Sequence, residues 1–406
     1  MKAPTLLSST HGASARGRAL LAAIATVLAL ATLTSATASA GSREQAQRIH
    51  DRLNGTPASQ ALLDSMQASI DSGNPTGAAL LAINDPNGMF YTVVLKNFVT
   101  PWTNVPQSVF APLNDYTATV IGMVRDEVPF NTLLSADIIY IGQSGLGLPA
   151  YSKTDNNHYV ALETNGVNLM TGLTSQPQSV VTGLPAAATA GVLTSRAAAA
   201  AFFDVGTNRR MFRFTMINHM CADLTTLMDT SRPTDRIRQD VSRSPGGDSR
   251  VYLNNCVGCH AGIDPMAQAF AYYDFTYASD PTTGQIVYTA GTPVAKYFHN
   301  NTTFPPGFIT ADDKWDNRWR AGPNALMGWD ATLPGSGNGA KSLGQEIAAS
   351  DQFAQCQVTK VFRAVCLRAP SDAADRAQVS TIKSNFKQGY SLKKVFAETA
   401  AYCMGN

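Results

Sequence analysis

Cys256, Cys259 and His260 form a C-x-x-C-H pentapeptide, the feature of this sequence that most restricts how the chain can fold. One turn of helix brings both sulfurs close to the two vinyl groups of a porphyrin, and the histidine that follows reaches the iron from the same side. C-x-x-C-H is the attachment signature of c-type haem. The sequence therefore predicts one covalent haem c per chain, bound through Cys256 and Cys259, with His260 on the iron.

Two other kinds of site also use a C-x-x-C pair. A thioredoxin-like redox pair lies at the start of a helix that follows a strand, and the loop-like residues 244–249 neither require nor forbid that context. A zinc site would take further ligands from His219 and Cys221. Both interpretations leave His260 without a role. Covalent haem is the preferred prediction, with zinc, a redox pair or a plain disulfide as alternatives.

The N-terminus has the pattern of an export signal. Basic residues at positions 2, 16 and 18 precede the apolar run 19–33, and residues 38–40 read Ala-Ser-Ala, an A-x-A cleavage site. The apolar run is shorter than the roughly 20 residues that span a bilayer. We expect residues 1–40 to be removed, which leaves a periplasmic or secreted bacterial protein without a membrane span.

The charge balance excludes one class of partner. The chain has 31 basic and 29 acidic residues, and losing the three basic residues of the signal changes its formal charge from +2 to about −1. Proteins that bind nucleic acid concentrate Lys and Arg against the phosphates. We therefore expect no nucleic-acid partner. The expected partner is a redox protein that recognises local features of this chain's surface.

Four cysteines remain outside the motif, and in an oxidising compartment they are expected to pair. Cys356 and Cys366 are ten residues apart in one predicted helix, which separates them by about 15 Å. A disulfide needs Cα atoms within about 7 Å, so these two cannot bond to each other. Cys366 can meet Cys403 if the last helix turns back after residues 368–370. Cys356 then pairs with Cys221.

Hydrophobic spacing and capping residues predict a mainly α protein. Segments 136–141 and 155–163 are ambiguous in their secondary structure. Between residues 280 and 342, six prolines and little periodicity predict a long loop-rich excursion that wraps the haem and supplies the sixth iron ligand. The predicted helices cover residues 42–53, 59–70, 88–99, 113–125, 207–229, 343–367 and 373–404.

The expected organisation has two parts after the signal. Residues 41–205 form a helical N-terminal domain, and residues 206–406 form a cytochrome-c-like haem domain whose C-terminal helices are tied by disulfides. Met327, in a Pro/Gly-rich setting 67 residues after His260, is the preferred sixth ligand. His299, another residue or an open iron site are the alternatives. Arg238 and Arg250 are candidates for pairing with the haem propionates.

The sequence around the motif resembles the planctomycete-type cytochrome c-like proteins, a family of exported bacterial haem proteins. Residues 256–266 read C-V-G-C-H-A-G-I-D-P-M and residues 269–275 read A-F-A-Y-Y-D-F. Together they are similar to that family's CxxCHxxIDPxGxxLExFD run, with Ala267, Phe270 and Ala271 in place of its Gly, Leu and Glu. Segments 128–137, 190–195 and 350–356 are similar to its pFxxLLTAD, AGLLT and SxxFAxC stretches, in the same order. The resemblance implies haem and export but no particular reaction.

The favoured functional prediction is a mono-haem cytochrome that transfers single electrons. The alternatives are a haem enzyme, a peroxidase or oxygenase with an open iron site, and a structural or assembly protein that carries haem. Residues 142–147 read G-Q-S-G-L-G, which resembles a nucleophile elbow but fails the G-x-S-x-G pattern at Leu146. No catalytic residue is therefore assigned, Ser144 included.

Overall fold

Helices dominate the computed structural model, which describes residues 40–297 and 301–405. They account for 53% of the structure and strands for 7%, which confirms the mainly α class. The predicted signal peptide lies outside the described residues except for Ala40, and so does His299. In the described part of the chain, no helix combines the length and the apolar character that crossing a bilayer requires.

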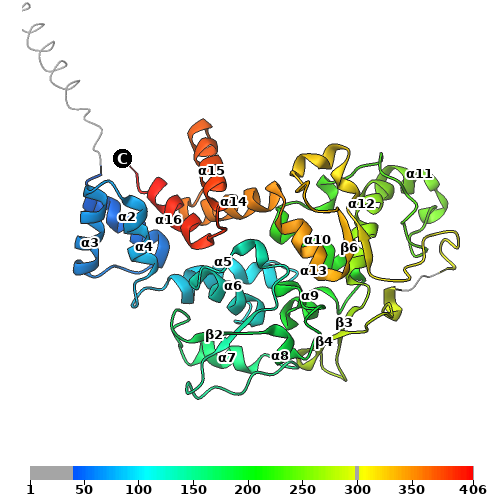
Figure 1. Cartoon of the computed structure of the whole chain (residues 1–406), viewed down its shortest axis with the longest axis horizontal. Helices are drawn as coiled ribbons and strands as arrows, with labels where there is room; N and C mark the ends of the chain where they lie inside the picture. Colours follow the sequence, from blue (N-terminus) through cyan, green and yellow to red (C-terminus); the bar gives the residue numbers. More distant parts are fainter. Residues whose placement is uncertain (1–39, 298–300, 406) are drawn as a thin grey trace, which may run out of the picture. The chain divides into compact units, whose positions relative to one another are not determined.

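Three short helices begin the described chain: α2 (Ser42–Asn54), α3 (Gln60–Asp71) and α4 (Pro75–Ile83). The Ser59 side chain caps α3 by accepting a hydrogen bond from a main-chain N–H of its first turn. The last helix, α16 (Leu392–Tyr402), packs against both α2 and α4 (Figure 1). The two ends of the described chain therefore share one hydrophobic core.

The middle of the chain builds a helical layer on a small sheet. A π-helical turn, Phe90–Leu95, continues through α5 (Lys96–Val99) into a 3-10 turn that includes Pro101, so the proline does not end this helical run. Helix α6 (Asp115–Arg125) packs directly on strand β1 (Ile139–Gly142): a Cβ at Gly122 would lie 2.0 Å from the Tyr140 ring. The elements that follow are α6 (Asp115–Arg125), β1 (Ile139–Gly142), α7 (Asn157–Thr164), β2 (Leu173–Gln176), α8 (Gln178–Thr182) and α9 (Arg196–Phe202). Strands β1 and β2 pair antiparallel, with Ile139 opposite Gln176.

Three predicted helices are wrong in extent. Helix α10 (Asn208–Met220) stops nine residues before the predicted end at 229, because Cys221 takes the left-handed conformation (φ 51°). The predicted helix 343–367 is two helices, α13 (Gly339–Ala348) and α14 (Asp351–Cys366), since Ser350 caps the second. The predicted helix 373–404 divides into α15 (Ala373–Phe386) and α16.

The loop-rich stretch between residues 280 and 342 contains short ordered elements. Strand β4 (Gln285–Tyr288) pairs antiparallel with β3 (Tyr273–Thr276), and β5 (Lys314–Asp316) pairs antiparallel with β6 (Ser336–Asn338). Trp315 and Trp319 from this stretch are almost fully buried. Burial of two indole rings anchors the excursion to the helices.

Both predicted disulfides are present. Cys221 bonds to Cys356 with Cα atoms 5.3 Å apart, and Cys366 bonds to Cys403 with Cα atoms 5.5 Å apart. One core cluster extends from Ala46 to Ala400 within the unit Ser42–Met404. Buried residues of this cluster lie on both sides of residue 205, where the sequence predicts a domain boundary.

Candidate functional site

The C-x-x-C-H motif lies at the start of α12 (Val257–Ala267), after a short helix, α11 (Ser249–Val251), and a π-helical turn, Tyr252–Cys256. Cys256 and Cys259 are both half-buried and both unbonded, in contrast to the other four cysteines. The Cys259 thiol donates to the Leu224 carbonyl at 3.4 Å. Burial raises the pKa of this thiol above its usual value. The motif therefore presents two thiols from the N-terminal end of one helix.

The imidazole of His260 is held by the carboxylate one turn further along α12. Its Nδ1 lies 3.1 Å from Oδ1 and 3.2 Å from Oδ2 of Asp264. The His260 side chain is 23% exposed, whereas that of Asp264 is fully buried. Among the described residues, no side chain or main-chain group bonds Nε2 of His260. This arrangement leaves Nε2 as the ring nitrogen that is available for a further bond.

Asp264 belongs to a buried network of alternating charges. Arg209 donates to its Oδ1 from Nε at 2.5 Å and forks onto Asp240 at 2.8 and 2.9 Å. Burial alone raises the pKa of Asp264, but the positive charge of Arg209 and the hydrogen bond from His260 hold it well below its usual value. Arg238 donates to Asp240 at 3.0 Å and to the Asn208 side chain at 3.0 Å. The network therefore links α12 to the N-terminal end of α10 through charges that compensate one another.

Glycines fix the opposite side of α12. A Cβ at Gly262 would lie 2.1 Å from Nε1 of Trp319, and a Cβ at Gly258 would lie 3.3 Å from Cβ of Met228. The main-chain N–H of Asp229 donates to the Gly258 carbonyl at 3.0 Å. Close packing at two glycines sets the position of the helix, and the charged network sets the face that carries His260.

The other three predicted site residues, Met327, Arg250 and Arg238, have contacts with residues outside the C-x-x-C-H motif. Met327 is buried in a 3-10 turn, Pro323–Met327, beside a cavity of about 220 Å³ whose lining does not include His260. Arg250 is exposed and pairs with Asp248 at 2.7 Å. Arg238 is buried and reaches the His260 network through Asp240. The structure thus places Cys256, Cys259 and His260 at the N-terminal end of α12 and links Arg238 to His260 through Asp264.

The residues of the zinc alternative are engaged elsewhere. Cys221 is in a disulfide, and Nε2 of His219 is bonded to the Tyr116 hydroxyl at 2.8 Å. In residues 40–297 and 301–405, no group of three or more His, Cys, Asp or Glu side chains is placed to hold a metal ion. The ligand set that the sequence suggested for zinc is therefore not assembled.

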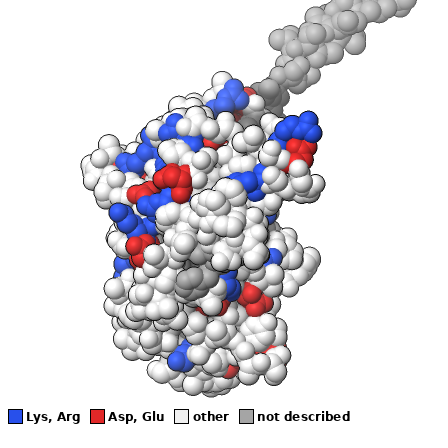
Figure 2. Space-filling view, turned by 90° about the vertical axis from the view of Figure 1, so that its right-hand side faces the viewer, with Lys and Arg blue, Asp and Glu red and all other residues white. Residues whose placement is uncertain are grey.

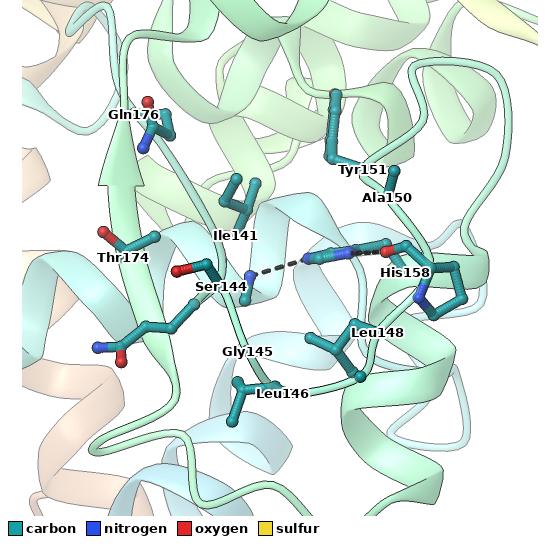
Figure 3. Close-up of a pocket in the computed structure, with 14 residues that line it drawn as sticks. Ile141, Ser144, Gly145, Leu146, Leu148, Ala150, Tyr151, His158, Thr174 and Gln176 are labelled. Carbon is teal, nitrogen blue, oxygen red and sulfur yellow. Dashed lines mark hydrogen bonds between the residues drawn. The ribbon is translucent and has the colours of Figure 1, made fainter.

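A separate cavity of about 560 Å³ lies under the loop that contains Ser144 (Figure 3). His158 accepts the Gly142 N–H at Nε2 (2.8 Å) and donates from Nδ1 to the Pro149 carbonyl (2.7 Å). The Ser144 hydroxyl points away from His158. Because both ring nitrogens are engaged, His158 is no base for Ser144, and it serves to fasten the loop.

Charges of both signs are interspersed on the face shown in Figure 2, with wide uncharged areas between them. Comparison of the chain with models of protein families, with curated proteins and with solved structures finds no match. The chemistry of α12 and its surroundings is therefore the basis for a functional proposal.

Proposed function

We propose that this chain is an exported mono-haem c-type cytochrome that transfers single electrons. The main support for the proposal is that four cysteines form disulfides whereas two do not. Four of them pair across distant parts of the chain, whereas Cys256 and Cys259 stay free at the start of α12. His260 follows directly and has its Nε2 available. Two thiols and one imidazole in this order are the donor set that haem c requires.

The surface beside the motif suits a flat apolar group. Leu253, three residues before Cys256, is 58% exposed, and Val251 and Met228 are partly exposed as well. Such side chains gain free energy when a porphyrin face removes them from water. In this assignment, Cys256 and Cys259 hold the haem by thioether bonds and His260 binds the iron. The bound group supplies a one-electron couple, whose potential the protein adjusts through ligation and burial.

Export and an electron-transfer partner are further parts of the proposal. Two disulfides are typical of proteins that leave the reducing cytosol, and the N-terminal residues have the pattern of a signal peptide. The resemblance to planctomycete-type cytochrome c-like proteins points in the same direction. The mixed charges in Figure 2 favour a redox partner that recognises individual surface groups rather than a large area of one charge sign.

A second candidate function, a haem peroxidase or oxygenase, is favoured by one specific contact. A carboxylate that accepts the Nδ1–H of a ligating histidine raises the basicity of the ligand, and Asp264 is placed to do this. A strong donor opposite an open position favours O–O cleavage. Addition of cyanide or carbon monoxide to the purified holoprotein separates the two candidates. Slow or absent uptake supports the electron carrier, whereas rapid uptake supports the enzyme.

Haem attachment is tested on protein produced with a cytochrome c maturation system. After denaturation and acid–acetone extraction, the haem should stay with the polypeptide. The Cys256→Ala/Cys259→Ala variant should release it, whereas the matched Cys366→Ser/Cys403→Ser variant should keep it. Free haem in the organic layer of the wild-type sample would contradict the proposal.

A further inference from the structure

We infer that Asp264 is a positioning residue that orients His260 and, through its negative charge, shifts the haem to a lower reduction potential. The inference rests on the proposed attachment of haem at α12. It adds a role for a carboxylate that the C-x-x-C-H motif itself does not contain. Asp264 touches neither the porphyrin nor a reacting group in this assignment, so it acts through the imidazole.

The geometry between the two side chains is the first support. Residues four apart on a helix lie on the same face, and Asp264 meets His260 across one turn of α12. Both carboxylate oxygens are nearly equidistant from Nδ1, at 3.1 and 3.2 Å. Nδ1 therefore carries the proton and donates it to the carboxylate. The ring is fixed in the tautomer whose Nε2 lone pair is free for a metal.

The surroundings keep the carboxylate charged and immobile. The Arg209 guanidinium contacts both oxygens, at 2.5 and 3.2 Å, and the main-chain N–H of Arg238 donates at 3.3 Å. Because the Asp264 side chain is fully buried, water does not compete for these bonds. An anion next to a ligating imidazole increases electron donation through Nε2 and favours the ferric over the ferrous state. The reduction potential of the haem is lowered as a result.

A purely structural role for Asp264 predicts a different pattern. Asp240 shares Arg209 with Asp264 and is also held by Arg238, but it makes no bond to His260. Loss of either carboxylate disturbs the link between α10 and α12. Only loss of Asp264 removes the charge beside the imidazole. Asp240 is therefore the matched control inside the same network.

The experiment compares midpoint potentials of the wild-type, Asp264→Asn, Asp264→Glu and Asp240→Asn holoproteins by spectroelectrochemical titration at one pH. Asp264→Asn keeps a hydrogen-bond acceptor of the same shape but loses the charge. It should favour reduction by about tenfold, which for one electron is a rise of about 59 mV. Asp264→Glu should return the potential towards the wild-type value, and Asp240→Asn should shift it by clearly less than Asp264→Asn.

A second measurement needs only the wild-type protein and covers the case in which Asp264→Asn does not fold. In the ferric holoprotein, the Nδ1 proton of His260 should exchange slowly with solvent in NMR spectra. An unchanged potential in Asp264→Asn, an equal shift in Asp240→Asn, or rapid exchange of the Nδ1 proton would each overturn the role of Asp264. These results leave haem attachment intact. Failure of the wild-type chain to bind haem would instead refute the proposed function, and the inference with it.

Discussion

Cys221, which ends α10 in a left-handed conformation, is bonded to Cys356 in the second turn of α14. Three further side chains of α14 donate to the carbonyls of the last three residues of α10. These are Gln352 to Met220 (2.8 Å), Gln357 to His219 (3.2 Å) and Lys360 to Asn218 (2.6 Å). The carbonyls at a helix C-terminus have no partner inside their own helix. The disulfide therefore holds α14 in place as the cap of α10.

The two disulfides should contribute unequally to stability. Cys221–Cys356 closes a loop of 135 residues and Cys366–Cys403 a loop of 37. In the chain-entropy model these loops correspond to about 5 and about 4 kcal/mol. Denaturant unfolding of Cys221→Ser/Cys356→Ser should therefore show a loss of unfolding free energy about 1 kcal/mol greater than for Cys366→Ser/Cys403→Ser. Equal losses, or a larger loss for the second pair, would contradict this ranking.

The disulfide pairing was predictable from sequence because it depended on a coarse quantity. Ten residues of helix separate Cys356 and Cys366 too far for a bond, whatever the details of the helix ends. The end of α10 was harder to predict, since apolar residues at helical spacing continue to Leu227. What stops the helix is the left-handed backbone at Cys221, which its bond to Cys356 holds in place. That constraint comes from a residue 135 positions away.

The candidate site also combines features that the local sequence predicts with features that depend on residues far away in the chain. Cys256, Cys259 and His260 are adjacent in sequence, so their meeting on one helix is a local property. The partnership of His260 with Asp264 also has a local signal, the spacing of four residues on a helix, which lies outside the C-x-x-C-H pattern itself. Arg209 has no such signal. It is 55 residues from Asp264, and only the packing of α10 on α12 brings the two together.

His219 should make stability depend on pH between about 6.5 and 5. Burial, together with the positive charge of Lys360, lowers the pKa of His219 well below its usual value. As the pH falls through 6.5, the unfolded chain binds a proton that the folded chain does not, so the unfolding free energy falls. The loss is at most about 1.4 kcal/mol per pH unit. His219→Gln should therefore have a shallower pH dependence of unfolding than the wild-type protein.

Tyr116→Phe is the control for this titration. It removes the hydroxyl bonded to Nε2 of His219 at 2.8 Å but keeps the imidazole. The variant should be less stable at every pH, because a buried ring nitrogen loses its partner. Its slope between pH 6.5 and 5 should stay like that of the wild-type protein. An identical slope in His219→Gln and wild type would show that His219 is not the group that titrates.

Arg238 and Arg250 should differ sharply in their effect on stability. The Arg238 side chain is 2% exposed, and its loss leaves the half-buried Asp240, whose side chain is 23% exposed, with one arginine instead of two. Breaking a fully buried ion pair costs about 3 kcal/mol, and because Asp240 keeps its two bonds from Arg209, Arg238→Met should lower the unfolding free energy in urea by less than that figure. Arg250 is exposed and pairs with its neighbour Asp248, so Arg250→Ala should leave the midpoint unchanged. Comparable losses in the two variants would contradict a structural role specific to Arg238.

Met327 is the preferred sixth ligand in the proposed cytochrome, and its neighbour offers a matched control. Met327 is buried and lines the same cavity as Leu227, whereas Leu326 is 92% exposed in the same 3-10 turn. A thioether ligand raises the reduction potential of a haem and gives a sulfur-to-iron absorption band at long wavelength. In the holoprotein, Met327→Ala should abolish that absorption band and should lower the reduction potential measured by redox titration. Leu326→Ala should change neither the band nor the potential. If Met327→Ala keeps the wild-type spectrum, Met327 is not the ligand, and His299→Ala then separates a histidine ligand from an open site.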